Sequence, residues 1–156
     1  MHRIEAAARG GALKRAISIG WRVHAVVALA LIPPLVEIAS FTHVERWLVR
    51  IGRDRIASAP EDEISAEWVD RMLRPLPPPW RHTCLRRAAV IYYLLRANGR
   101  SVDLCIGVRR DATGVLLAHA WLMRDGVVYL EPKAAIENVP EYTMIARFPP
   151  MKAGTA

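Results

Sequence analysis

Four prolines within five residues, Pro75 and Pro77 to Pro79, constrain the fold of this chain more than any other feature. Proline lacks a backbone N–H and pushes the preceding residue toward an extended conformation, so a helix is not expected to continue through such a run. The residues before it are rich in alanine and apolar side chains and predict helices. The residues after it change from a helical to an alternating pattern. The sequence therefore predicts an N-terminal helical region over 1–74 and a core over 75–156.

The helix that follows the prolines carries a cysteine in its first turn. Thr83 is a suitable N-cap, and Asn98-Gly99 suits the end of a helix. Apolar side chains recur between them at helical spacing, at Leu85, Ala88, Ala89, Tyr92 and Leu95. Cys84 then lies where backbone N–H groups are free and where the helix dipole favours a thiolate. The alternative is a buried cysteine that packs as a small hydrophobe.

Alternating apolar residues after this helix predict an antiparallel sheet. The three strands are expected over Val102–Arg109, Val115–Met123 and Val127–Glu131. His119 lies in the second strand, within Ala118-His119-Ala120-Trp121. A strand-borne histidine beside a cysteine at a helix N-terminus forms the pair that enzymes use for acyl chemistry.

The turn between the second and third strands decides whether a carboxylate reaches His119. A two-residue loop at Asp125-Gly126 would turn Glu131 away from His119. A three-residue loop with a G1 bulge at Gly126 would place Glu131 directly opposite His119, on the same face. We predict the three-residue loop, in which Glu131 accepts a hydrogen bond from the imidazole and fixes its tautomer.

Three segments, Thr83–Ala88, Ile106–Arg109 and Ala118–Trp121, together resemble a known family. They are similar to the transglutaminase-like cysteine peptidases, and more closely to the leader peptidase of lasso-peptide biosynthesis. The resemblance runs from Trp80 to Pro132. It implies an α+β fold with a papain- or transglutaminase-like core, in which the cysteine helix packs on an antiparallel sheet. Here an apolar helical N-terminal region precedes that core.

The resemblance also implies a catalytic triad. Its nucleophile is Cys84, its base is His119, and its third member is Glu131, where the wider superfamily more often has aspartate. Asp125 is the competing carboxylate, but its place before Gly126 suits a turn. The implied reaction is removal of the leader from a ribosomally synthesised lasso-peptide precursor, without a cofactor. The alternatives are acyl transfer to an amine, and a non-catalytic scaffold for the cyclase.

The partners that the resemblance implies are the precursor peptide, a separate leader-recognition protein and an ATP-dependent lasso cyclase. In the longer, fused form of this peptidase the recognition domain precedes the peptidase in the same chain. Residues 1–74 contain no run of short strands, which favours the standalone form. The sequence has no glycine-rich phosphate loop, so ATP binding by this chain is not expected.

The net charge of +7 limits the kinds of partner. Residues 1–56 carry nine Lys or Arg and four Asp or Glu, residues 57–74 two and five, and residues 75–156 eleven and six. Such a balance suits an acidic peptide, an acidic protein surface or anionic lipid. No cluster of basic residues is interleaved with aromatic ones, so nucleic acid is not expected as a partner.

The N-terminal region predicts helices over Ala6–Ile19, Leu35–Ile51 and Glu61–Leu73. Between the first two, Val23–Ile32 is an apolar run that Pro33-Pro34 is expected to stop. The longer stretch Val23–Ile38, which contains His24, Pro33, Pro34 and Glu37, is short of the roughly 20 apolar residues that span a bilayer, which favours core helices packed on the peptidase. The alternatives are contact with the membrane surface and docking to the cyclase.

The absence of a secretory signal over Met1–Arg22 predicts a cytoplasmic protein with reduced cysteines, or one peripheral to the inner face of the membrane. Cys105 is expected to pack within the first strand. The remaining histidines lack the spacing of metal ligands, so no metal site is expected. His82, two residues before Cys84, is a competing base, but it would leave His119 idle.

Two further pairs of residues flank the predicted site. Arg86 and Arg87 follow Cys84 on the helix and either bind substrate carboxylates or are solvated. Trp80 and Trp121 are expected to wall the cleft, and Trp121 shares the face of His119 and could shield the pair from water.

Overall fold

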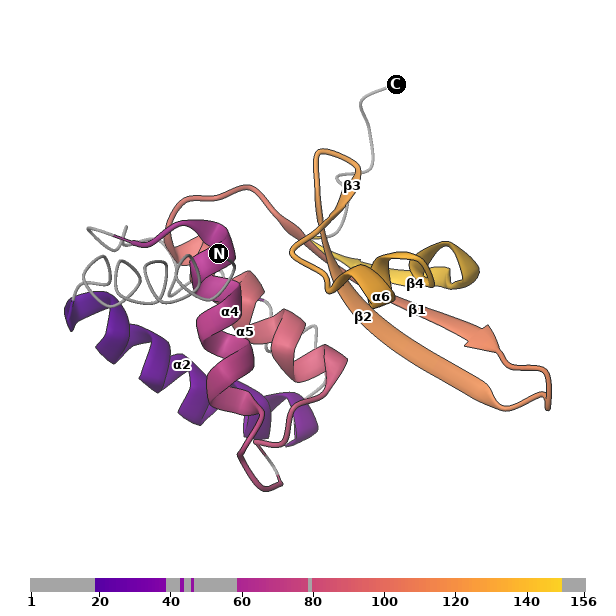
Figure 1. Ribbon diagram of the computed structural model, residues 1–156, viewed down its shortest axis with the longest axis horizontal. Coiled ribbons are helices and arrows are strands. Elements are labelled where there is room, and N and C mark those ends of the chain that lie inside the picture. Colours follow the sequence, from indigo (N-terminus) through magenta and orange to yellow (C-terminus); the bar gives the residue numbers. More distant parts are fainter. Residues whose placement is uncertain (1–18, 39–42, 44–45, 47–58, 79, 150–156) are drawn as a thin grey trace, which may run out of the picture.

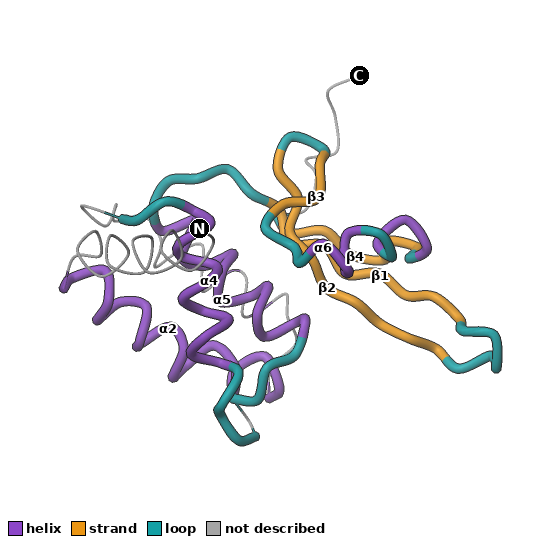
Figure 2. Tube along the Cα trace, viewed as in Figure 1, coloured by secondary structure: helices purple, strands orange, loops and turns teal. Residues whose placement is uncertain are grey.

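The computed structural model describes residues 19–38, 43, 46, 59–78 and 80–149. Within them, three long helices gather on one side of a four-stranded antiparallel sheet (Figure 1). Figure 2 shows the same separation of helices from strands, with a long hairpin that extends away from the helices. The predicted α+β fold is therefore confirmed.

The cysteine helix α5 spans Cys84–Ala97, as the sequence predicts. Thr83 caps it, because its hydroxyl oxygen accepts a hydrogen bond from the Arg86 backbone N–H at 3.3 Å. At its other end Gly99 has φ 75°, a conformation that suits glycine after a helix. Most side chains between these ends are buried, so α5 is the central helix of the core.

Helix α2 spans Ile19–Ile38 and continues through Pro33 and Pro34. The prediction that these prolines end the helix is therefore wrong. A proline cannot donate to the carbonyl one turn before it, which leaves the Ala30 carbonyl without its Pro34 partner. The Trp80 indole N–H donates to that carbonyl at 3.0 Å, so a residue fifty positions away replaces the missing bond.

The other N-terminal predictions have mixed outcomes. The helix expected over Glu61–Leu73 is confirmed as α4, Asp62–Leu73. The helix expected over Ala6–Ile19 lies outside the described residues, apart from Ile19. Of the helix expected over Leu35–Ile51, the first four residues belong to α2, and most of the rest lies outside the described residues.

Helices α2 and α4 both pack against α5. The Trp21 ring of α2 meets the Trp68 ring of α4 edge-on, with centroids 5.3 Å apart. The Tyr93 hydroxyl of α5 is hydrogen-bonded to His24 of α2 at 2.6 Å. These contacts place the cysteine helix, α2 and α4 in one hydrophobic core.

Among the described residues, α2 is the one helix long and apolar enough to cross a bilayer. The expectation that the apolar run is too short is wrong, because the unbroken helix has 20 residues. One face of α2, with Trp21, Ala25 and Ile32, is buried in the core. The other face exposes apolar side chains, namely Ile19, Val23, Val26, Val27 and Leu31.

The sheet has the order β3-β2-β1-β4, and every neighbouring pair is antiparallel. The strands are β1, Asp103–Arg110; β2, Leu116–Arg124; β3, Val127–Tyr129; and β4, Thr143–Phe148. The first two agree with prediction to within one residue at each end. The sequence pattern did not predict β4, because this edge strand exposes Met144 and Ile145 and lacks a clear apolar alternation.

The turn between β2 and β3 has two residues, so the predicted three-residue loop is wrong. Arg124 pairs with Val127, and the two turn residues, Asp125 and Gly126, have φ 51° and 80°. Positive φ at both central positions is typical of a type I′ turn, which the Asp-Gly sequence favours. The twist of this turn matches the twist of the two strands that it joins. The strand β3 is also shorter than predicted, because it ends at Tyr129.

The two faces of the sheet are buried against different partners. Leu104, Ala120 and Leu122 belong to the core that contains α5. Cys105 and Trp121 pack on the opposite face with Val139. This second cluster is built from the segment after β3, which folds into α6, Lys133–Ile136, and the 3₁₀ turn η1, Val139–Glu141.

Candidate active site

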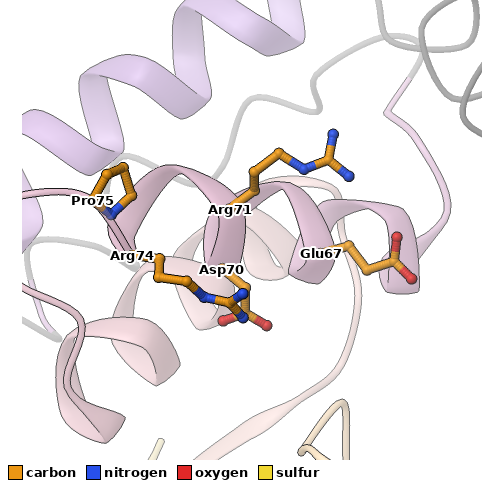
Figure 3. A pocket seen from close by; sticks show the side chains of 5 residues that line it. All are labelled: Glu67, Asp70, Arg71, Arg74 and Pro75. Carbon is orange, nitrogen blue, oxygen red and sulfur yellow. The ribbon is translucent and has the colours of Figure 1, made fainter.

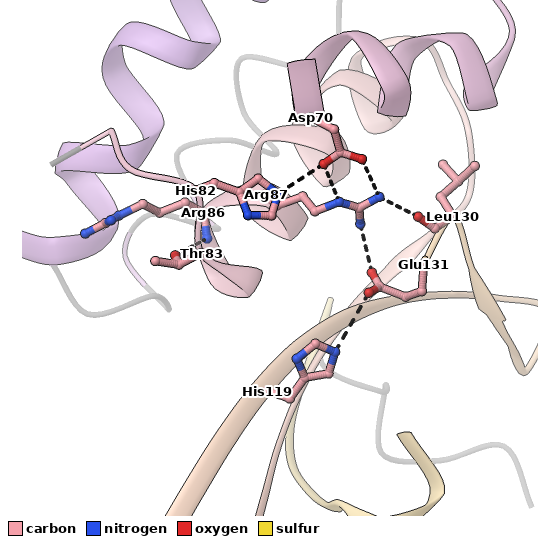
Figure 4. Close-up of polar contacts among 8 residues, drawn as sticks. All are labelled: Asp70, His82, Thr83, Arg86, Arg87, His119, Leu130 and Glu131. Atoms are coloured by element: carbon pink, nitrogen blue, oxygen red, sulfur yellow. Dashed lines mark hydrogen bonds and ion pairs between the residues drawn. The ribbon is translucent and has the colours of Figure 1, made fainter. Parts of the chain in front are cut away.

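A buried guanidinium group lies at the centre of the site. The side chain of Arg87, one helical turn after Cys84 on α5, is only 5% exposed. Its Nε and Nη2 donate to the two carboxylate oxygens of Asp70, on α4, at 2.7 and 3.1 Å. Its Nη1 donates to Glu131 at 3.0 Å, and Nη2 also donates to the Leu130 carbonyl at 2.6 Å (Figure 4). Arg87 therefore joins α4 to the segment that follows β3.

Glu131 lies between Arg87 and His119. Its side chain is 3% exposed, and its Oε2 lies 3.8 Å from His119 Nε2. The predicted approach of Glu131 to His119 is confirmed, although the register that was expected to produce it is wrong. The predicted hydrogen bond is not formed, since 3.8 Å is an ion-pair distance and His119 Nε2 has no hydrogen-bond partner. Because Nε2 faces Glu131, Nδ1 is the imidazole nitrogen left for proton transfer.

Burial and the Arg87 charge shift the two ionisable groups of this pair. Burial raises the pKa of Glu131, and the nearby positive charge of Arg87 opposes that rise. Burial also lowers the pKa of His119, and the same Arg87 charge lowers it further. Arg87 therefore favours the charged form of Glu131 and the neutral form of His119.

Aromatic rings surround His119 on its face of the sheet. The Trp121 ring lies nearly parallel to the imidazole at a centroid distance of 6.0 Å, and the Tyr142 ring is 5.4 Å away. Gly107 pairs with His119 across the strands, and a Cβ at Gly107 would lie 2.7 Å from the Trp121 ring. The close approach of Trp121 thus requires glycine at this position. Trp121 shares the face of His119 as predicted.

Cys84 is the first residue of α5 and is a free, partly exposed cysteine. The first backbone bond of the helix runs from the Arg87 N–H to the Thr83 carbonyl at 2.9 Å. The Cys84 N–H lies in the first turn, where a helix offers donors without intrahelical acceptors. Within the described residues, no hydrogen bond joins the Cys84 thiol to His119. The site thus brings His119 and Glu131 together and leaves the thiol unbonded to them.

Cys105 differs from Cys84 in its burial. It lies in β1, is fully buried and is a free cysteine. Burial raises the pKa of its thiol to about 11, so it is protonated at neutral pH. The prediction that Cys105 is a packed side chain is confirmed.

The structure assigns the neighbouring polar residues to other contacts. The His82 Nε2 is 3.2 Å from Asp70 Oδ1, so this histidine also meets the charged network. Arg86 forms an ion pair with Glu37 of α2 and donates to the Arg81 carbonyl at 2.9 Å. Neither Arg86 nor Arg87 is solvated, and both are engaged with protein partners. The Asp125 side chain is 91% exposed in the turn.

The sequence pattern does not predict that Asp70 and Arg87 belong to one network. Asp70 is one of several acidic residues of α4, and Arg87 is one of two adjacent arginines. Only the packing of α4 on α5 shows that they meet. A local signal exists in the sequence, because Arg87 is followed by the apolar residues 88–95, which cover every side of the helix, and an unpaired charge beside them would be costly.

A hollow of about 450 Å³ lies beside Asp70, along the exposed face of α4 (Figure 3). Its lining residues are Glu67, Asp70, Arg71, Arg74 and Pro75. Among the described residues, the Arg71 and Arg74 guanidinium groups form no ion pair. The hollow is therefore a charged surface next to the buried network.

In the described part of the chain, no group of three His, Cys, Asp or Glu side chains lies close enough together to hold a metal ion.

The sequence model of the family described as the transglutaminase-like superfamily matches residues 19–147. The match includes Cys84, His119 and Glu131, and it extends over α2 and α4 as well as over the cysteine helix and the sheet. No protein of curated function and no solved structure gives a significant match to the chain.

Proposed function

Because the chain belongs to the transglutaminase-like superfamily, whose members are typically cysteine peptidases or acyltransferases, we propose that it is a cysteine peptidase. In this proposal Cys84 is the nucleophile, His119 is the base, and Glu131 orients His119. The observation that carries the proposal is the buried carboxylate of Glu131, 3.8 Å from His119 Nε2 and held by Arg87. A buried carboxylate beside a strand-borne histidine, together with a partly exposed cysteine at a helix N-terminus, is typical of covalent acyl chemistry.

The reaction begins when the Cys84 thiolate attacks the carbonyl carbon of the scissile peptide bond. A carbon–sulfur bond forms, and the carbonyl electron pair moves to oxygen. The Cys84 backbone N–H and a second donor stabilise this oxyanion, an effect of about 3–4 kcal/mol for each donor in comparable sites. The carbon–nitrogen bond then breaks, and protonated His119 gives its proton to the leaving amine.

The second half of the reaction hydrolyses the thioester that remains on Cys84. His119, now neutral, takes a proton from water as the water attacks the thioester carbonyl. The carbon–sulfur bond breaks, the new carboxylate leaves, and the Cys84–His119 pair is restored. Glu131 stabilises the imidazolium that is present before the first half and forms again in the second. The aromatic wall of Trp121 and Tyr142 limits the access of water to one side of the imidazole.

The substrate in this proposal is a ribosomally synthesised lasso-peptide precursor, from which the peptidase removes the leader. The support is the resemblance of three segments to leader peptidases of lasso-peptide biosynthesis. We further propose that a separate protein presents the leader and that an ATP-dependent cyclase receives the freed core peptide. The positive charge of the chain suits an acidic partner or peptide. A cytoplasmic location, with α2 either in the core or at the inner face of the membrane, completes the proposal.

The test is mass spectrometry of a precursor peptide after incubation with the chain and its leader-binding partner. Wild type is expected to release separate leader and core masses, whereas Cys84→Ala is expected to leave the precursor intact and remain folded. Cys105→Ala is the matched control, since it removes the other cysteine but leaves the helix N-terminus unchanged. Cleavage by Cys84→Ala would refute the proposed nucleophile.

Acyl transfer is the second candidate, because the superfamily includes acyltransferases and the same triad serves both reactions. It is distinguished by adding a primary amine to the same assay. A product whose new C-terminus carries the amine would show transfer, whereas a free carboxylate would show hydrolysis. If wild type and Cys84→Ala both leave the precursor intact and both support maturation by the cyclase, the chain is a scaffold.

A further inference from the structure

We infer that Asp70 and Arg87 are positioning residues of the active site: Asp70 fixes the Arg87 guanidinium, and the guanidinium fixes Glu131 against His119. The inference deepens the proposed function. Only its kinetic test rests on the proposed function, because the titration of His119 needs no substrate. It assigns a role in the chemistry to α4, a helix outside the three segments that resemble the leader peptidases.

The geometry of the Asp70–Arg87 contact is that of a two-bond fork. Nε and Nη2 of the guanidinium each meet a different oxygen of the same carboxylate, at 2.7 and 3.1 Å. Such a planar, paired contact fixes the rotation of the guanidinium as well as its distance. The remaining N–H groups are then directed at Glu131 and at the Leu130 carbonyl. Asp70 therefore sets the direction in which Arg87 donates.

The charges of the network lead to the same conclusion. Arg87 carries one positive charge, and Asp70 and Glu131 each carry a negative charge when ionised. Asp70 balances the guanidinium, which leaves the charge of Glu131 to stabilise an imidazolium at His119. Without Asp70, Arg87 and Glu131 would balance each other, and the imidazolium would lose its counter-charge.

The groups that face His119 come from several elements. Glu131 approaches from the segment after β3, Arg87 from α5 and the Tyr142 ring from the residue after η1. Asp70 acts from α4 through Arg87. His82, which also contacts Asp70, holds the outer side of the network near the start of α5. Of these groups, Asp70 is the one that contacts Arg87 and can be changed without touching His119 or Glu131.

The test compares Asp70→Asn with Asp103→Asn. Asn has the shape of Asp but no charge, so both variants are expected to fold. Asp103 is a close match, because it also accepts two bonds from one arginine, Arg147, and its side chain is 23% exposed against 24% for Asp70. It lies in β1, outside the network. Asp70→Glu is the second variant, since it keeps the negative charge.

Two readouts are measured on the full chain. The first is the His119 titration by NMR, assigned with a His119→Asn variant, which needs no substrate. Asp70→Asn is expected to lower the pKa of His119, Asp70→Glu to restore most of the wild-type titration, and Asp103→Asn to leave it unchanged. The second readout is cleavage, in which Asp70→Asn is expected to lower kcat by about 10- to 100-fold without a change in KM.

Two outcomes would overturn the inference. An unchanged His119 titration in folded Asp70→Asn would show that Asp70 does not act on the pair. A higher KM with unchanged kcat would show that Asp70 acts on the substrate through the neighbouring hollow. Failure of the proposed function would look different: wild type would not cleave, or Cys84→Ala would cleave, while the NMR titration would still decide the role of Asp70.

Discussion

The cost of removing Arg87 can be worked out from its contacts. In Arg87→Met the apolar part of the side chain is kept, but the hydrogen bonds to Asp70, Glu131 and the Leu130 carbonyl are lost. Glu131, 3% exposed, is left as a buried carboxylate without its counter-charge. Breaking a buried ion pair from one side typically costs about 3–5 kcal/mol. Since domains are stable by only about 5–15 kcal/mol, Arg87→Met is expected to be close to the limit of folding.

The loss of unfolding free energy in Arg87→Met should depend on pH, and the pKa of Glu131 decides whether it grows or shrinks as the pH rises. Burial raises the pKa of this group above the ordinary value of 4.5, so its favourable contribution to folding is complete below pH 4.5 and is lost as the pH rises through the folded pKa. Arg87 opposes that rise. Removal of Arg87 therefore raises the pKa of Glu131 further, and more of the favourable contribution of Glu131 to folding is lost at higher pH. The destabilisation by Arg87→Met should therefore be larger at pH 7 than at pH 4.

The assay is urea denaturation followed by circular dichroism, at both pH values, with the slope of the transition checked for equality between proteins. Arg147→Met is the control, because Arg147 also pairs with a carboxylate, Asp103, but both side chains are partly exposed. Exposed pairs typically contribute about 0–1 kcal/mol. A loss of less than about 1 kcal/mol for Arg87→Met at pH 7, or the same loss at pH 4 and pH 7, would refute the reasoning.

Three further predictions concern the site and its surroundings. His119→Ala should slow cleavage by about 10²–10⁴-fold, because it removes the proposed proton-transfer group. Glu131→Gln should slow cleavage less, because Glu131 is proposed only to orient that group. Single-turnover rates measure both effects, and an equal loss would give Glu131 a larger role. Gly107→Ala should displace the Trp121 ring, which its Cβ would meet at 2.7 Å, and cost about 1–3 kcal/mol of unfolding free energy, so an unchanged melting temperature contradicts the close packing. Trp80→Phe should cost about 0.5–1.5 kcal/mol, because the Ala30 carbonyl loses the hydrogen bond that the indole N–H donates to it. Thermal denaturation measures this cost, and no loss would mean that water replaces the indole.

The features that the sequence predicted correctly depend on near neighbours. The start of α5 follows from Thr83 and the prolines before it, and its end from Asn98-Gly99. The strand that carries His119 follows from alternation over a few residues. In each case the residues that decide the structure lie within one or two turns of the feature, so local propensity and burial agree.

The features that the sequence did not predict depend on contacts between distant residues. The Ala30 carbonyl, which Pro34 leaves without a helical donor, accepts a hydrogen bond from the Trp80 indole, which is distant in the chain. The Asp70–Arg87 fork requires α4 to pack on α5. The sequence alone gives no reason to select Trp80, Asp70 and Arg87 from among the other tryptophans, acidic residues and arginines of the chain.

The approach of Glu131 to His119 despite the wrong register follows from Leu130. This residue has φ 57°, a left-handed conformation that costs a residue with a side chain roughly 1–2 kcal/mol. It ends the pairing of β3 and redirects the next side chain, so that Glu131 reaches His119 from a register that would otherwise turn it away. Arg87 holds both parts of this arrangement, the Leu130 carbonyl at 2.6 Å and the Glu131 carboxylate at 3.0 Å. The acid is thus positioned by the helix that begins with Cys84 rather than by strand pairing. The proposed nucleophile and the carboxylate that orients its base are therefore fixed to the same element, α5.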